Sequence, residues 1–209
     1  HPKTKVVVNF VPVLLDQLDD FAPQFSTKQI RCPLLRLLAT PELENITMQD
    51  RLYIFDSCFL SNHENMLQPY PAYKRLHDLY QVFNKVSERE LKYFSGQYLA
   101  DLLVWYHLAW MGESVRRNNE LVIKLMAKNQ EFNYEDRLQL FTLIGELIQD
   151  LIPRYRKLAE SGQIELSTTP HYHPLAPLLI DFSSARDSQP DVTLPVHNFY
   201  PGGRSRVAF

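Results

Sequence analysis

The segment from residue 162 to 177 gathers the side chains most able to do chemistry: one acid, Glu165, and two imidazoles, His171 and His173. The sequence around the acid predicts a buried strand over residues 164–168 that runs into a polar turn. A carboxylate inside such a strand is costly unless it is paired or functional. Loops at the ends of strands are where α/β enzymes keep their sites. We therefore expect the functional site at this turn.

Prolines 170 and 174 frame the two histidines. A residue before proline is held toward extended geometry, which applies to Thr169 and His173. Two extended residues at i and i+2 project to the same side, as we expect of His171 and His173. Three interpretations remain open. The pair could bind a metal together with Glu165, hydrogen-bond sugar hydroxyls as neutral imidazoles, or cap the following helix. Glu165 itself could be paired with an arginine for structural reasons alone.

A second cluster of functional residue types lies on a predicted helix and comprises Trp105, His107 and Trp110. At helical spacing, Trp105 and Trp110 fall on different faces and His107 lies between them. Core packing explains at least one of the two indoles. The sharper interpretation is that these rings line a sugar subsite, because an aromatic face can stack on a pyranose ring. Asp101, one turn earlier, could orient a partner but is expected to be solvated.

These side chains must be positioned by a mostly helical chain. Val6–Phe10 is a β-branched run typical of a central parallel strand, and Pro12 is suited to begin a helix. Gly162 is expected to cap the longest helix, and a second strand follows over Gln163–Thr168. The other predicted helices cover residues 28–38, 48–59, 73–84, 96–110, 114–127 and 134–160, the last one kinked or restarted at Pro153.

This order of elements predicts an α/β fold. Strand, helices and strand at this separation indicate a parallel crossover, with residues of about 26–132 as a helical insertion. Because two strands make no adequate sheet for a domain of this size, either the helical part stands largely alone or the chain is a piece of a barrel, and we expect the whole of 1–209 to be part of a barrel. The first residue is His1 rather than Met, so the chain is expected to start inside a larger protein. From Asp181 onward the sequence is polar and loop-like.

Composition narrows the possible functions. The 209 residues carry 22 basic and 24 acidic side chains, and a net charge of −2 gives no reason to expect nucleic acid or a membrane surface as partner. The two cysteines, Cys32 and Cys58, form no Cys-x-x-Cys pair, which favours a reducing, cytoplasmic location. There is no phosphate-cradling glycine loop, no Gly-x-Ser-x-Gly elbow and no His-Glu-x-x-His motif.

Several stretches resemble glycoside hydrolase family 57, and nearest is its α-amylase and amylopullulanase-like branch. They keep the family's order along the chain: Val8–Leu14, Asp101–Trp110, Ile152–Tyr155 and, similar to the second signature region, Gly162–Leu166 with Thr169–Pro174. The resemblance implies an incomplete (β/α)7 TIM-like barrel that performs retaining cleavage or transfer of α-glucan chains. It implies neither a metal nor another cofactor.

The resemblance also implies roles for particular residues. Glu165 matches an active-site carboxylate near the sugar, and His173 matches a ligand of a sugar hydroxyl. His107 stands where the family more often has Asn. The nucleophile Glu and the acid/base Asp are expected after Phe209, so this chain would hold the front half of a catalytic domain and no catalytic residue of its own.

Two other functions stay open at this point. One is a metal-dependent polysaccharide deacetylase that uses Glu165, His171 and His173 as ligands. The other is a non-catalytic barrel that binds glucan. The sequence does not distinguish hydrolysis from transfer or one glucosidic linkage from another.

Overall fold

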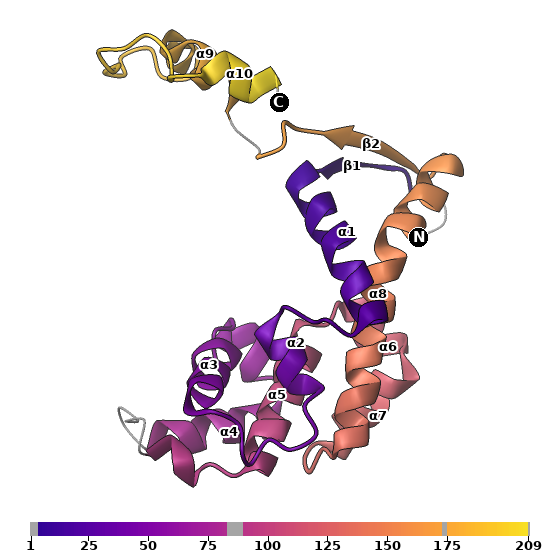
Figure 1. Ribbon diagram of the computed structural model, residues 1–209. Helices are drawn as coiled ribbons and strands as arrows, with labels where there is room; N and C mark the ends of the chain where they lie inside the picture. The colour runs from indigo at the N-terminus through magenta and orange to yellow at the C-terminus, as the bar shows by residue number, and fades with distance from the viewer. Residues whose placement is uncertain (1–3, 83–89, 173–174, 209) are drawn as a thin grey trace. The chain divides into compact units, whose positions relative to one another are not determined.

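A computed structural model describes residues 4–82, 90–172 and 175–208, and it is mostly helical with one small parallel sheet (Figure 1). The chain divides into two compact units. We call residues 1–23 with 147–209 the sheet unit and residues 24–146 the helical unit. The boundaries fall inside two helices, α1 (Pro12–Thr27) and α8 (Tyr134–Glu160).

The sheet unit is built on strands β1 (Val6–Phe10) and β2 (Ile164–Thr168), which pair in parallel with Val7 opposite Glu165 and Asn9 opposite Ser167. Side chains alternate across a strand, so the polar residues of this register share one face and Phe10 lies on the other. The Phe10 ring meets the ring of Tyr155 on α8 edge to face, with centroids 4.8 Å apart. The predicted parallel pairing of these two strands is therefore confirmed.

Gly162 ends α8 in the way the sequence predicts. Its φ is +67°, a value that favours glycine, and its N–H donates to Ala159 O at 2.9 Å. The N–H of Gln163 donates to Leu158 O at 3.0 Å, which completes a C-cap that turns the chain from helix into strand.

The chain after β2 holds more helix than the sequence indicated. Helix α9 (Ala176–Ile180) follows the histidine turn, and a 3-10 helix (Phe182–Asp187) and α10 (Gly203–Ala208) occupy the segment from Asp181 that was expected to be loop. Gly203 permits this arrangement because a Cβ there would lie 1.8 Å from Leu179 O, closer than any real contact. A six-residue helix packed through glycine leaves little periodic signal in the sequence.

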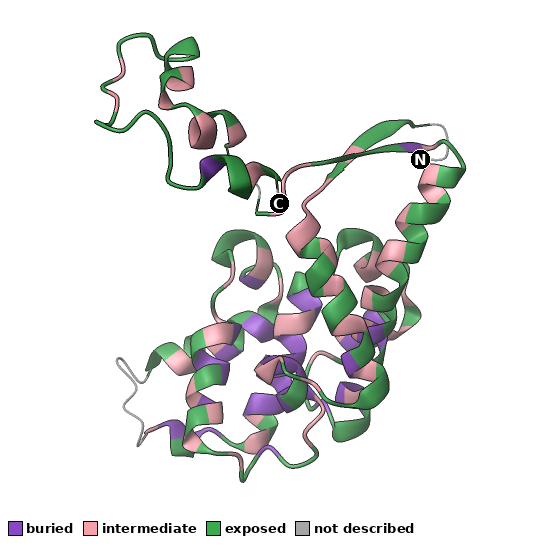
Figure 2. Cartoon of the chain, turned by 45° about the horizontal axis from the view of Figure 1, so that its top comes forward, coloured by how far each residue is buried: buried purple, intermediate pink, exposed green. Residues whose placement is uncertain are grey.

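The helical unit contains the larger hydrophobic core. Its regular elements are α2 (Pro33–Leu38), α3 (Met48–Cys58), a π-helix (His63–Leu67), α4 (Pro71–Val82), a 3-10 helix (Glu90–Tyr93), α5 (Gly96–Trp110), α6 (Glu113–Asn118) and α7 (Glu120–Lys128). Buried residues gather on α2, α3 and α5, whereas β2 and the segment after it are mostly exposed (Figure 2). No helix within the described ranges has the length and apolar character to cross a membrane.

Two buried arginines hold loops of the helical unit in place. Arg51 donates to the carbonyls of Glu44 and Phe94 at 2.5 and 2.6 Å. Arg137 donates to Thr40 O at 2.6 Å and Pro41 O at 2.9 Å, just beyond the end of α2. Arg51 is 5% exposed and Arg137 is 3% exposed. The hydrogen bonds of each guanidinium therefore compensate for removing its charge from water.

Two details of the predicted helices are wrong. The helix expected over 28–38 begins only at Pro33, because Lys28 has a φ of 58° and ends α1. The helix expected over 114–127 is interrupted at Asn119, whose side chain accepts the N–H of Val122 and starts α7 afresh. At Pro153, α8 continues without a restart, so a kink there stays a prediction.

Candidate functional site

Polar groups gather where β1 and β2 end, at the edge where parallel α/β sheets keep their sites. Ser167 Oγ donates to Asn9 Oδ1 at 3.1 Å, and Thr168 Oγ1 donates to Phe10 O at 3.0 Å. Both contacts join the last residues of one strand to the last residues of the other. Hydroxyl and amide groups of this kind can donate hydrogen bonds to a polyhydroxylated ligand and accept hydrogen bonds from it.

His171 lies in the turn that follows β2 and pairs with an acid on a different element. Its Nε2 is 2.6 Å from Oδ2 of Asp16, on the second turn of α1. The His171 side chain is 22% exposed and that of Asp16 is 69% exposed, so the pair borders solvent. The Tyr172 ring packs edge to face on the imidazole at 4.5 Å. These contacts fix the orientation of the ring at the sheet edge.

Sequence reasoning missed Asp16 because it lies 155 residues before His171. The position of Asp16 in the sequence could have indicated its role. Asp16 follows the first predicted strand by one short helical turn, and the carboxyl ends of neighbouring parallel strands meet at one edge. His173, the other predicted ligand, lies outside the described residues.

Glu165 is exposed, and the prediction of a buried strand is wrong beyond Ile164, the one buried residue of β2. In the described part of the chain β2 pairs with β1 alone, and the four residues after Ile164 are exposed. Within residues 4–82, 90–172 and 175–208, the Glu165 carboxylate makes no hydrogen bond or ion pair. Among the described residues it has no structural arginine partner, and it shares its strand face with Val7 and Ser167.

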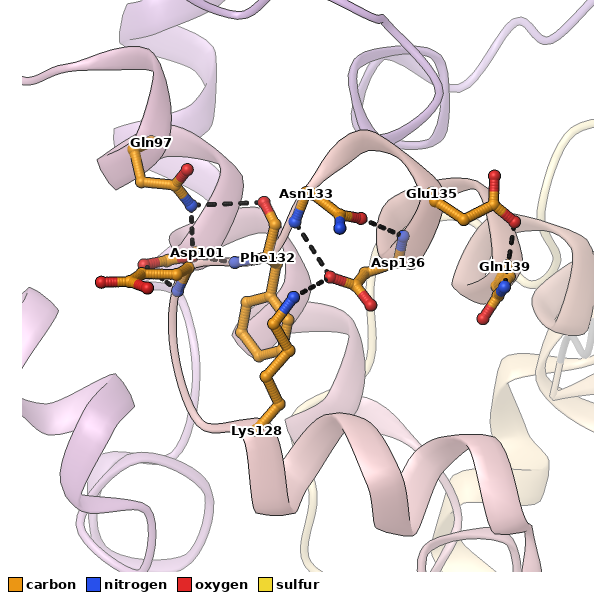
Figure 3. A network of polar contacts seen from close by, with 9 residues as sticks. Gln97, Asp101, Lys128, Phe132, Asn133, Glu135, Asp136 and Gln139 are labelled. Carbon is orange, nitrogen blue, oxygen red and sulfur yellow. Dashed lines mark hydrogen bonds and ion pairs between the residues drawn. The ribbon is translucent and has the colours of Figure 1, made fainter.

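Asp101 in the helical unit is buried rather than solvated, contrary to the sequence-based expectation. Oδ1 accepts the N–H of Phe132 at 2.9 Å and Oδ2 accepts that of Glu131 at 3.1 Å, while Gln97 Nε2 donates to Oδ1 at 2.9 Å (Figure 3). Burial raises the pKa of Asp101, and these hydrogen bonds oppose the rise. The carboxylate thus fastens the loop between α7 and α8 to α5.

Trp105 belongs to the same stripe of α5, four residues after Asp101. It is 3% exposed, and its Nε1–H donates to Asn129 O at 2.9 Å in the fastened loop. Its ring packs at 5.4 Å from that of Tyr70. An indole enclosed in this way has no open face for a sugar, so its packing role is the one that the structure supports.

His107 and Trp110 differ from Trp105 in their surroundings. His107 Nδ1 lies 2.7 Å from Leu103 O, an arrangement in which Nδ1–H donates, and burial lowers the pKa of the imidazole to about 4. His107 is therefore neutral near pH 7. Trp110 is 55% exposed and lies 6.1 Å from the ring of Tyr106. Of the three predicted ring ligands on α5, Trp110 is the one that presents its ring to solvent.

The predicted site residues divide between the two units. Glu165 and His171 lie in the sheet unit, and Trp105, His107 and Trp110 lie in the helical unit. Among the residues that the structure describes, no three His, Cys, Asp or Glu side chains come close enough together to hold a metal ion. Glu165 and His171 thus do not form part of such a group there.

The comparison with family models gives one match. The model for Glycosyl hydrolase family 57 matches residues 32–193, a range that includes α5, α8, β2 and the His171 turn. This match favours neither the deacetylase nor the non-catalytic barrel. Searches of curated proteins and of solved structures found no match to the chain.

Proposed function

The chain belongs to Glycosyl hydrolase family 57, a family of carbohydrate-active enzymes, and from this premise we propose a function in α-glucan cleavage or transfer. The proposed reaction is that of a retaining glycoside hydrolase or glucanotransferase, on starch-like or glycogen-like chains. The single observation that carries the proposal is the polar edge formed by the ends of β1 and β2 with the His171–Asp16 pair.

The proposed role of His171 is to bind sugar hydroxyls. Its contact with Asp16 orients the imidazole, and both side chains border solvent. Asn9 and Ser167 supply an amide and a hydroxyl at the same edge. Sugar hydroxyls both donate and accept, so such a mixed set of groups suits them better than it suits a charged ligand.

Glu165 is proposed as a further sugar ligand. Its carboxylate is exposed and makes no bond to the described residues, so its acceptor sites are available to hydroxyl groups. His173 is also proposed as a ligand of a sugar hydroxyl, and in the helical unit Trp110 is proposed as an exposed ring for stacking on a sugar. Charge-assisted hydrogen bonds to a carboxylate are stronger than neutral ones, which makes Glu165 the most sensitive position to test.

We propose that neither catalytic carboxylate of the retaining mechanism lies in this chain. Retaining enzymes need a nucleophile and an acid/base about 5 Å apart. In the proposed enzyme these are a Glu and an Asp that follow Phe209. The two parallel strands joined through α8 are accordingly proposed as neighbouring strands of an incomplete (β/α)7 barrel, with residues 1–209 as one part of the catalytic domain. The proposed location is cytoplasmic, consistent with two free cysteines.

The test uses the intact enzyme that contains this chain, with maltooligosaccharides as substrate. We expect Glu165→Gln to lower turnover by about 100-fold or more, as losses of strong active-site hydrogen bonds do, with little change in the thermal unfolding midpoint. Asp150→Asn is the matched control, because Asp150 is an exposed acid on α8. An unchanged rate in Glu165→Gln would assign Glu165 a role other than sugar binding.

The 209-residue chain by itself provides a second test. We expect no turnover of starch and weak binding of maltoheptaose that is lost in Glu165→Gln. Calorimetry measures the binding, and release of reducing ends measures turnover. Efficient starch hydrolysis by the isolated chain would overturn the proposal that the catalytic carboxylates lie elsewhere.

A further inference from the structure

A cavity of about 890 Å³ lies wholly within the helical unit, apart from every predicted sugar ligand. It is bounded by the loop that joins α1 to α2, by the end of α2 and by the first half of α8. Its lining residues are Phe25, Lys28, Gln29, Ile30, Arg31, Arg36, Ala39, Thr40, Pro41, Tyr134, Leu138, Phe141 and Thr142. Its volume falls in the range of roughly 300–1,000 Å³ that is typical of small-molecule sites.

The charged groups that line this cavity are all cations. Lys28, Arg31 and Arg36 contribute three basic side chains, and no carboxylate is among the described lining residues. Arg36 is paired with Asp50 at 2.6 Å. The Lys28 ammonium makes no ion pair or hydrogen bond with the described residues. A cavity with this balance of charge attracts anions.

A further cation lies behind the wall of the cavity. The Arg137 guanidinium is 5.4 Å from the ring centroid of Tyr134, a lining residue. Arg137 is 3% exposed, and within the described residues it donates to carbonyls and forms no salt bridge. Glu42 is the acid that acts on it electrostatically. A buried charge in low-dielectric surroundings is screened weakly, so it adds to the positive potential.

The loop that carries two of the cations is held in one conformation. The buried Gln24 accepts the N–H of Arg31 through Oε1 at 2.9 Å. Lys28 has a φ of 58°, an unfavourable conformation for a residue with a Cβ that must be maintained by its surroundings. A loop fixed in this way pays less ordering entropy when it binds a ligand.

The floor of the cavity is apolar and aromatic. The rings of Phe25 and Phe141 lie 5.2 Å apart, and a Cβ at Gly145 would lie 2.6 Å from the Phe25 ring. Leu138 and Ile30 extend this surface. The ring of an organic ligand packs favourably on such an apolar surface, whereas an inorganic phosphate ion gains no binding energy from it.

We propose that this cavity binds a small organic phosphate, with the phosphate at Lys28 and the ring of the ligand on the Phe25–Phe141 floor. A sugar phosphate and a nucleotide share this chemistry. The site is separate from the glucan site proposed above, and its test does not depend on glucan cleavage.

The experiment titrates the 209-residue chain by calorimetry with glucose 6-phosphate, ADP, inorganic phosphate and glucose. We expect glucose 6-phosphate or ADP to bind more tightly than inorganic phosphate, and glucose not to bind. The stronger of the two organic phosphates identifies the source of the ligand. Lys28→Asn should weaken that binding by about tenfold or more, because it removes a charge-assisted contact while Asn tolerates the positive φ.

Two further variants separate a built site from diffuse charge. Lys124→Gln is the matched control, since Lys124 is an exposed lysine of α7 that does not line the cavity. It should leave binding unchanged. Phe141→Leu should weaken the organic phosphates more than inorganic phosphate. Thermal unfolding midpoints show that each variant is folded. Equal losses in Lys28→Asn and Lys124→Gln, equal binding of glucose, or no binding of any phosphate probe would overturn the proposal.

Discussion

His107 makes the stability of this protein depend on pH in a way that one substitution should remove. Burial lowers the pKa of His107 from 6.5 to about 4, and the hydrogen bond to Leu103 O only partly opposes this. A histidine whose folded pKa lies below its unfolded pKa favours folding while it is neutral. Its contribution is therefore complete above pH 6.5 and is lost as the pH falls toward 4.

The size of the effect follows from the two pKa values. A shift from 6.5 to about 4 corresponds to a loss of about 3 kcal/mol of unfolding free energy once the pH reaches 4, and of about 2 kcal/mol at pH 5. His77 contributes in the same direction, because burial also lowers its pKa. Asp101 contributes in the opposite direction, because burial raises its pKa. The change of the unfolding free energy with pH is thus the sum of contributions from several titrating groups.

Comparing the unfolding free energies of wild type and His107→Asn at each pH isolates the contribution of His107. Asn cannot titrate, and its amide can still donate to Leu103 O. Urea unfolding at pH 7, 6, 5 and 4.5 would give the free energy for both proteins. We expect the variant to lose about 2 kcal/mol less than wild type between pH 7 and pH 5. Parallel pH profiles, or an NMR titration of His107 with a midpoint near 6.5, would refute the reasoning.

Three further predictions concern other contacts. Asp101→Asn should lower the unfolding free energy by about 2 kcal/mol in urea unfolding at pH 7, because an amide cannot accept from Gln97 and from both loop N–H groups at once; no loss would mean that the loop is held by other contacts. Gly162→Ala should cost about 1 kcal/mol in the same assay, since nothing lies within 4 Å of an added Cβ and only the φ of +67° is unfavourable; a loss several times larger would point to a clash. Asp16→Asn in the intact enzyme should raise the KM for maltooligosaccharides several-fold by weakening the orientation of His171, and an unchanged KM would detach this pair from the glucan site.

Local pattern determined most of the helices and both strands. The apolar positions of α8 repeat at helical spacing over Tyr134–Glu160, and the predicted bounds match the structure. The β-branched run predicted strand β1, and Gly162 predicted the end of α8. Both predictions were possible because strand propensity and positive φ are properties of a few adjacent residues. Family membership also followed from short motifs along one chain.

Contacts between distant residues needed the tertiary structure. Spacing indicated a solvated Asp101 and left open whether Trp105 packs in the core or stacks on a sugar, yet both contact a loop that begins more than twenty residues later. The cavity near Lys28 is completed by Tyr134, Leu138 and Phe141 of α8, which lie far along the chain from the α1–α2 loop. Burial depends on what covers a residue, and no local pattern records that.

For Glu165 and His171, too, the sequence determined one part of the site and the tertiary structure another. Sequence alone marked Glu165 and His171 as chemically active types beside a strand end. Only the fold decided that Glu165 is exposed and that His171 pairs with Asp16, 155 residues away. Parallel strands bring their carboxyl ends together whatever the length of the connection between them, so the partner of a residue at that edge is set by topology rather than by its neighbours in the chain.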